Sequence, residues 1–189
     1  MNHIREEFVK PPHSLPIHQH CINFTLVGSG LTGEEWIKDA EKNGYDLSEK
    51  AKSALLSPKY NLEHRITPGR EYEVSLILGE AIPKDTERMT VTFKNLAKEQ
   101  LGEESIADLK GEHALLLLKK LSKSKIELNG LVGIIVPHKF ILDPNDKAIV
   151  LGLKRREGKL IVGGYEDVPR REWEHNDAFV FVRYAAPIQ

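Results

Sequence analysis

The C-terminal part of the chain carries the pattern that most restricts its fold. Four runs rich in β-branched and aromatic residues follow Asn129-Gly130, over 131–142, 148–153, 160–165 and 178–185. They are separated by Asp-Pro-Asn-Asp, by Arg-Glu-Gly and by a charged loop. Parallel strands need a long crossover, whereas antiparallel strands can follow one another through a tight turn. Residues 131–185 are therefore predicted to form a four-stranded antiparallel meander.

The residues before this meander predict mainly helices. Thr32-Gly-Glu-Glu35 has the form of a capping box, in which the threonine and glutamate side chains satisfy main-chain N–H groups at a helix start. Asn43-Gly44 supplies the corresponding stop. Periodicity predicts helices over 33–43, 48–57, 91–101 and 112–122, and further strands over 22–27 and 72–78. The four consecutive leucines from Leu115 to Leu118 predict that the last helix is central to the core.

Together these elements predict an α+β fold. We expect an N-terminal helical pair and central helices packed on a mainly antiparallel sheet of about five strands. Residues 1–21 are rich in proline and histidine and are predicted to form an extended arm. Residues 22–189 are predicted to form one domain, helical to about residue 128.

Composition narrows the class of protein. Hydrophobic residues make up 40% and charged residues 29% of the 189 residues, as in soluble globular proteins. No apolar run is long enough to span a bilayer or to act as a secretion signal. Cys21 is the only cysteine, so the chain forms no internal disulfide. We therefore expect a cytoplasmic protein that does not contact membranes.

Charge is unevenly distributed along the chain. Residues 1–109 hold 13 Lys/Arg and 18 Asp/Glu, a net of −5, whereas residues 110–189 hold 14 and 10, a net of +4. Basic clusters in the second part can attract phosphate. The candidate binding residues are Lys154, Arg155, Arg156, Lys159, Arg170 and Arg171. Alternatively, these residues, interleaved with glutamates, are ordinary solvated turns and helix faces.

Several segments carry a resemblance. They are Leu31-Thr-Gly-Glu-Glu-Trp36, Ala51-Lys-Ser-Ala-Leu-Leu-Ser-Pro58, Gly130-Leu-Val-Gly-Ile-Ile-Val-Pro-His138 and Asp177-Ala-Phe-Val-Phe-Val182. With these segments the chain resembles a group of uncharacterised bacterial proteins over most of residues 22–182. The resemblance implies a single domain and a bacterial origin, and it brings no activity with it.

Gly28-Ser-Gly30-Leu-Thr-Gly33 matches the G-x-G-x-x-G spacing of a dinucleotide-binding loop, with Asp46 at a suitable distance beyond it. In such a loop, glycines let main-chain amides approach a pyrophosphate, and the following helix leads into a second parallel strand. After Gly44, however, the sequence predicts a turn and another helix. We therefore predict a strand-to-helix turn without a nucleotide cofactor.

The helices predicted over 33–57 have some features of a DNA-binding helix-turn-helix. Ala40 and Gly44 have the spacing of its turn, and Lys50 lies on the second helix. However, Lys50 and Ser53 occupy positions of the recognition helix that should be apolar. An ordinary helical hairpin packed on the sheet is the better prediction.

Histidines near the N-terminus form a candidate metal site with the lone thiol. His18 and His20 would lie on one face of a strand, beside Cys21. A distant His64 or His138 could complete tetrahedral coordination of zinc or nickel. Structural sites of this kind normally contain close pairs such as Cys-x-x-Cys, so the alternative is a set of exposed histidines. We expect no cofactor, with zinc as the alternative.

His138 and Asp143 are the candidate catalytic residues. Val136-Pro-His places the imidazole at a predicted strand end, where a nearby carboxylate can orient it as a general base. No nucleophile signature accompanies it. Asp143-Pro-Asn-Asp146 is also typical of a simple hairpin turn.

Two classes of function follow from these observations. A non-catalytic binding or interaction module would contact nucleic acid or a protein partner through the basic C-terminal half, which accounts for the charge asymmetry. The alternative is a small hydrolase-type or metal-dependent enzyme centred on His138 or on the His18, His20 and Cys21 cluster. The binding module is our leading prediction.

Overall fold

The computed structural model of the chain describes residues 21–123, 130–166 and 170–183. The α-helices in these residues are α1 (Gly33–Asn43), α2 (Glu49–Leu55), α3 (Pro58–Glu63), α4 (Thr90–Leu101), α5 (Glu104–Ala107) and α6 (Glu112–Lys123). The strands are β1 (Cys21–Val27), β2 (Glu71–Leu78), β3 (Gly133–Ile135), β4 (Ile141–Leu142), β5 (Ala148–Arg156), β6 (Lys159–Glu166) and β7 (Asp177–Arg183). Two short 3-10 helices, η2 (Gly79–Ala81) and η3 (Asp85–Glu87), follow β2. Apart from Cys21, the predicted N-terminal arm lies outside the described residues.

Local signals place most of these elements where the sequence predicts them. Thr32 and Glu35 form the expected capping box at the start of α1. Gly44 ends α1 in the left-handed conformation, with φ of 70°. Pro58 lies just past the end of α2, as the predicted helix over 48–57 implies, and it also occupies the first turn of α3, a short helix that the sequence did not predict. A missing N–H costs nothing at that position.

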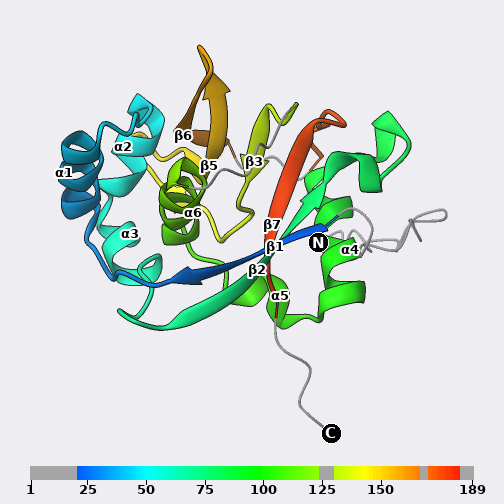
Figure 1. Ribbon diagram of the computed structural model, residues 1–189, viewed down its shortest axis with the longest axis horizontal. Coiled ribbons are helices and arrows are strands. Elements are labelled where there is room, and N and C mark those ends of the chain that lie inside the picture. The colour runs from blue at the N-terminus through cyan, green and yellow to red at the C-terminus, as the bar shows by residue number, and fades with distance from the viewer. Residues whose placement is uncertain (1–20, 124–129, 167–169, 184–189) are drawn as a thin grey trace, which may run out of the picture.

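The strands form one mixed sheet in the order β1-β2-β7-β3-β5-β4, with β6 paired to β5 (Figure 1). The sheet is mostly antiparallel, as predicted, but it has seven strands rather than about five. The predicted strand over 131–142 is interrupted and forms β3 and β4, which pair with different parts of β5.

The predicted four-stranded meander is wrong in one respect. The strands β4, β5 and β6 pair antiparallel in succession through tight turns, as predicted, whereas β7 lies between β2 and β3 and runs parallel to β3. From Asp177 to Val182 every residue of β7 is buried. A strand that is buried on both faces is most stable inside a sheet with neighbours on both edges, and the connection 167–176 is long enough to carry it there.

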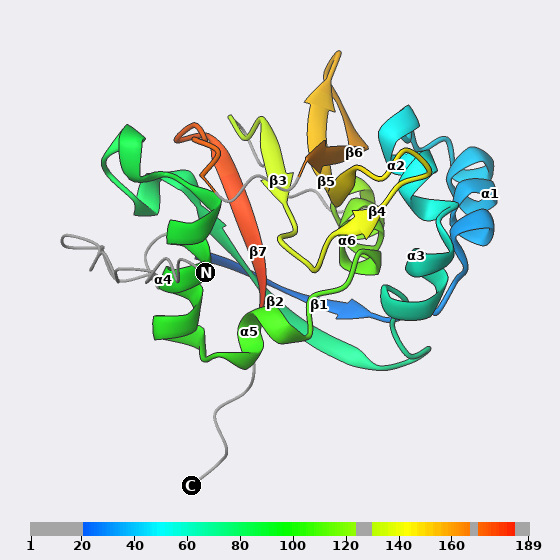
Figure 2. The ribbon, with the colours of Figure 1, turned by 180° about the vertical axis from the view of Figure 1, so that it is seen from behind.

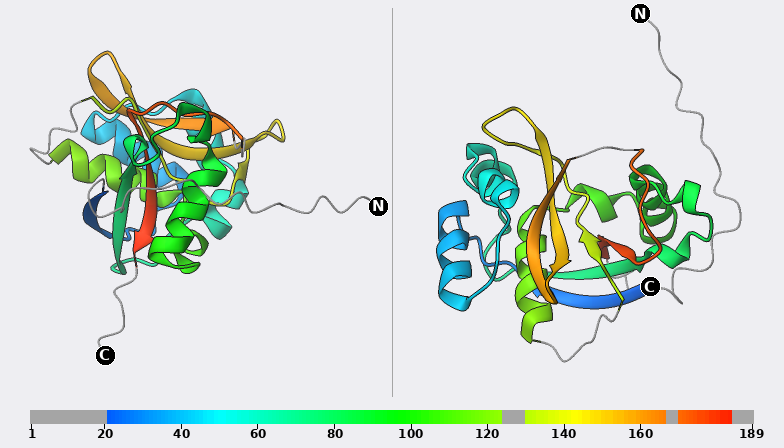
Figure 3. Two further views of the ribbon diagram at one scale, coloured as in Figure 1. Left: turned by 90° about the vertical axis from the view of Figure 1, so that its right-hand side faces the viewer. Right: turned by 90° about the horizontal axis from the view of Figure 1, so that it is seen from above.

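The sheet curls around α6 (Figure 3). This helix contacts β1 at one end of the strand order and β5 and β6 toward the other end. Its residues from Glu112 to Leu118 are all buried, which confirms the predicted central position of this helix. On the other face of β7, α4 packs with the rings of Phe93 and Phe179 stacked 4.1 Å apart. Figure 2 shows α3 beside β4, where the Ser57 hydroxyl donates to the Leu142 carbonyl.

Candidate functional site

The glycine-rich loop 28–33 joins β1 to α1 and is held by close main-chain packing. A Cβ at Gly28 would lie 2.5 Å from the Thr67 carbonyl oxygen. Gly30 has φ of +67°, a conformation that side chains disfavour, and its carbonyl accepts hydrogen bonds from the Arg65 guanidinium. These constraints explain why glycines are needed here without a nucleotide.

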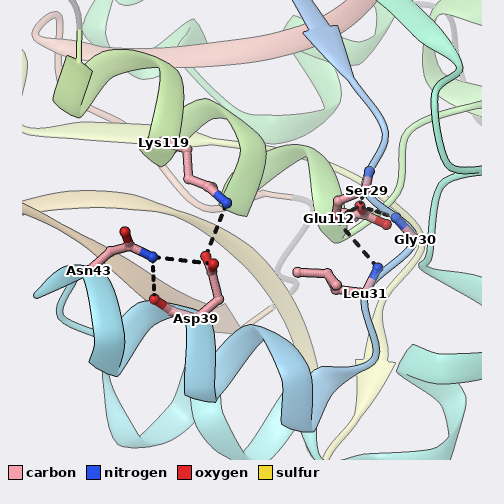
Figure 4. Close-up of polar contacts among 7 residues, drawn as sticks. All are labelled: Ser29, Gly30, Leu31, Asp39, Asn43, Glu112 and Lys119. Carbon is pink, nitrogen blue, oxygen red and sulfur yellow. Dashed lines mark hydrogen bonds and ion pairs between the residues drawn. The ribbon is translucent and has the colours of Figure 1, made fainter.

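The N–H groups of this loop bind a carboxylate of the chain itself. Glu112, at the start of α6, is fully buried. Its Oε1 accepts hydrogen bonds from the Ser29 N–H at 2.9 Å, the Ser29 hydroxyl at 2.6 Å and the Gly30 N–H at 2.9 Å (Figure 4). Its Oε2 accepts from the Ile66 N–H at 2.6 Å. The anion at this loop is therefore Glu112, where a dinucleotide-binding loop holds a phosphate.

The surrounding topology also differs from a dinucleotide-binding fold. The strand that follows α1 in the sequence is β2, and it pairs antiparallel with β1. Such a fold requires a parallel strand at this point. Sequence analysis identified the loop but not Glu112, because 83 residues separate Glu112 from Ser29.

The helical pair α1 and α2 packs onto the rest of the fold. Lys119 of α6 binds Asp39 of α1 at 3.1 Å and lies 5.2 Å from the Trp36 ring centroid. Asn43 donates to the other oxygen of Asp39 (Figure 4). Lys50 of α2 pairs with Glu166 of β6. This arrangement agrees with a helical pair packed on the sheet.

His138 is a buried histidine with both ring nitrogens bonded to main chain. Its Nε2 accepts from the Leu151 N–H at 2.8 Å, so Nδ1 carries the proton and donates to the Lys139 carbonyl at 2.5 Å. Burial lowers the pKa of His138 to about 3. Asp143 Oδ1 instead accepts from the N–H groups of Asn145 and Lys147. Asp143 therefore closes its own turn, and its carboxylate does not orient the His138 ring.

Two further histidines are buried near His138. The rings of His64 and His138 meet edge to face at 4.9 Å, and His64 Nδ1 accepts from the Gly111 N–H. His113 lies on α6, and its Nδ1 accepts from the Lys110 N–H at 3.0 Å. Among the described residues, neither His64 Nε2 nor His113 Nε2 has a hydrogen-bond partner. Burial lowers the pKa of each to about 4.

The sequence pattern indicated His64 only as a distant metal ligand, and it did not indicate His113 as a candidate. A signal for His113 was present, because it directly precedes the apolar run of a helix predicted to be central. The described residues contain no group of three or more histidine, cysteine, aspartate or glutamate side chains able to hold a metal ion. His18 and His20 lie outside the described residues. The Cys21 thiol donates to the Asn23 side chain at 3.4 Å.

Exposed positive charge is concentrated on the β5–β6 hairpin, which protrudes from the molecule (Figure 1). Its turn places Glu157 and Gly158 at positive φ, as in a tight two-residue hairpin turn. Arg155, Arg156 and Lys159 are exposed, and Lys154 is half-buried. Within 154–159 these four cations are accompanied by one carboxylate, that of Glu157.

Two contacts shape the hairpin. Arg155 donates to the Leu131 and Gly158 carbonyls, which places its guanidinium against the main chain. Arg156 makes only a long contact of 3.8 Å with Glu157, and both side chains are largely exposed. Arg156 therefore remains accessible to a ligand.

The other predicted basic pair, Arg170 and Arg171, lies in the loop before β7, and both residues are exposed. The Arg171 guanidinium lies 4.4 Å from the Trp173 ring centroid and 5.7 Å from that of Tyr165. Trp173 is only 7% exposed and donates to the Thr90 hydroxyl. Arg171 is therefore the outer layer of this stack, and Trp173 is beneath it.

Comparison of the chain with protein-family models, curated proteins and solved structures finds no match. The resemblance to uncharacterised bacterial proteins therefore stays a prediction. Among the described residues, no helix has the length and apolar character needed to cross a bilayer.

Proposed function

We propose that this chain is a non-catalytic binding module that contacts nucleic acid through the β5–β6 hairpin. The observation that carries this proposal is the concentration of cations there, a net charge of +3 over residues 154–159, on a protruding element. Phosphate backbones attract such a surface and release counterions when they bind. Arg156 and Lys159 contribute exposed charges that form no close ion pair with the described residues.

The interior supports the non-catalytic part of this proposal. Two buried groups with the chemistry of a general base or acid, His138 and Glu112, each bind main-chain groups of the chain itself. A general base must reach the proton that it removes. Both residues are buried, at 1% and 0% exposure, so neither faces solvent.

The test is binding of a fluorescently labelled 20-nucleotide strand, followed by anisotropy as a function of salt concentration. Contact with three or four phosphates predicts a slope of log K against log salt of roughly −2 to −3. Charge reversal in the Arg156→Glu/Lys159→Glu variant should weaken binding about tenfold or more at low salt. The opposite charges then repel the phosphates instead of attracting them.

The matched control is the Lys38→Glu/Lys42→Glu variant, which changes the net charge equally on exposed positions of α1. It should bind nearly as the unmodified chain does. Equal loss in both variants would show that net charge alone governs binding. That result, or no binding at low salt, would overturn the proposal.

A further inference from the structure

We infer that the bound nucleic acid is single-stranded and that one of its bases stacks on the exposed Arg171 guanidinium. This inference rests on the proposed function and specifies its ligand. Guanidinium planes and aromatic rings are the usual platforms for unpaired bases. Here the central carbon of the Arg171 guanidinium lies 4.4 Å from the centroid of the buried Trp173 ring, and the Arg171 side chain is exposed to solvent.

The Arg171 stack lies on the same face of the sheet as three of the four hairpin cations, Lys154, Arg156 and Lys159, whereas Arg155 is on the other face. In β5 and β6, residues two apart share a face. The register pairs Lys154 with Ile161, Gly152 with Gly163, and Val150 with Tyr165. Lys154 and Tyr165 therefore lie on the same side, and Arg171 lies over the Tyr165 ring on that side.

Glycines form the floor between these side chains. A Cβ at Gly163 would lie 3.2 Å from Lys154 Cδ, and a Cβ at Gly152 would lie 3.0 Å from Tyr165 Cε2. Without those Cβ atoms, Lys154 and Tyr165 can lie flat along the sheet. The Tyr165 hydroxyl donates to the Leu153 carbonyl, which fixes the ring across β5. The register therefore places the cationic hairpin tip and the Arg171 stack at the two ends of one face of the β5–β6 hairpin.

The length of this surface suits a short stretch of nucleic acid. Lys159, at the hairpin tip, is six residues from Tyr165 along β6, which corresponds to about 20 Å at roughly 3.3 Å per residue. A strand that contacts Arg156 or Lys159 through phosphate can therefore reach Arg171 only by extending along the sheet. Single-stranded binding surfaces combine these two components, a basic track and a stacking platform.

Charge around Arg171 favours one strand over two. Glu172 and Glu174 are exposed in the same loop as Arg171. Their carboxylates would repel the phosphates of a second strand. In a duplex, moreover, the bases already stack on one another and are not available to a guanidinium. Arg171 therefore contributes its plane, while the hairpin supplies most of the positive charge.

The experiment compares three labelled ligands by anisotropy: a 12-nucleotide thymidine strand, an abasic strand of the same length and charge, and a duplex containing the thymidine strand. The test variant is Arg171→Lys, which keeps the charge and removes the planar guanidinium. We expect about fivefold or greater loss of affinity for the thymidine strand, as for loss of one stacked base. Affinity for the abasic strand should change less than about twofold, since phosphate contacts persist.

The control is Arg170→Lys, at the neighbouring exposed arginine, which should leave all three affinities unchanged. An unchanged melting temperature of the Arg171→Lys variant would confirm that it folds. Equal loss for the thymidine and abasic strands, no loss for either, or tighter binding of the duplex would overturn this inference. None of these outcomes would contradict binding through the β5–β6 hairpin. The proposed function is tested separately, by the Arg156→Glu/Lys159→Glu variant.

Discussion

Glu112 accepts hydrogen bonds from both the N–H and the hydroxyl of Ser29, a residue 83 positions earlier in the chain. Through this contact the start of the central helix α6 holds the loop between β1 and α1. The same carboxylate binds the Ile66 N–H, which ties in the segment before β2. One buried side chain thereby joins three segments that are distant in sequence.

Glu112→Gln tests this role. The substitution keeps the size of the side chain but replaces one acceptor oxygen with an N–H donor, which then faces N–H groups of the main chain. We expect the free energy of unfolding to fall by about 3 kcal/mol, because buried donors lose their acceptor. Urea denaturation measures this change. The control is Glu34→Gln at an exposed position, which should change the free energy of unfolding by less than about 0.5 kcal/mol. A loss below about 1 kcal/mol in Glu112→Gln would contradict the assigned role.

Gly33→Ala tests how closely the glycine-rich loop packs. A Cβ at Gly33 would overlap the Leu55 carbonyl at the end of α2, so we expect a loss of about 3 kcal/mol. The comparison variant is Gly44→Ala, where φ is +70° and no atom lies within 4 Å of the added Cβ. The only cost there is the strain of an alanine in the left-handed conformation, which should lower the free energy of unfolding by about 1 kcal/mol. Thermal or urea denaturation measures both losses of stability. A larger loss in Gly44→Ala than in Gly33→Ala would show that packing at Gly33 is not tight.

The three buried histidines predict loss of stability in mild acid. Burial holds the pKa of His64 and His113 at about 4 and that of His138 at about 3. An unfolded histidine has a pKa of about 6.5. Below that pH the unfolded chain binds protons that the folded chain does not, so the free energy of unfolding falls as the pH falls. Each histidine should contribute about 1.2 kcal/mol to the loss of stability between pH 6 and 5, where most carboxylates stay ionised.

Urea titrations at pH 7, 6 and 5 measure this slope. His138→Gln should reduce the loss of stability between pH 6 and 5 by about 1.2 kcal/mol, because it removes one histidine whose pKa is lowered by folding. His175 is exposed, and His175→Gln should leave the slope unchanged. Stability that does not depend on pH across this range would mean that these imidazoles can be protonated in the folded protein.

Elements governed by local interactions were predictable from the sequence. Thr32 and Glu35 cap α1 through contacts three residues apart, and Gly44 ends it through its own backbone conformation. The alternation of β1 and β2, and the charges of the hairpin, likewise depend on neighbouring residues. The composition of the proposed nucleic-acid surface, from Lys154 to Arg171, was therefore visible in the chain, although the stacking of Arg171 on Trp173 was not.

Contacts between distant segments required the tertiary structure. Burial on both faces places β7 between β2 and β3, where the short connections had suggested a meander. Similarly, the N–H groups of the glycine-rich loop are satisfied by Glu112, and His138 bonds to Leu151. Local periodicity specifies helix or strand because hydrogen bonds and side-chain directions repeat within a few residues. Which strand becomes a neighbour, and which side chain fills an anion-binding loop, depends on burial that arises only when the whole chain has packed.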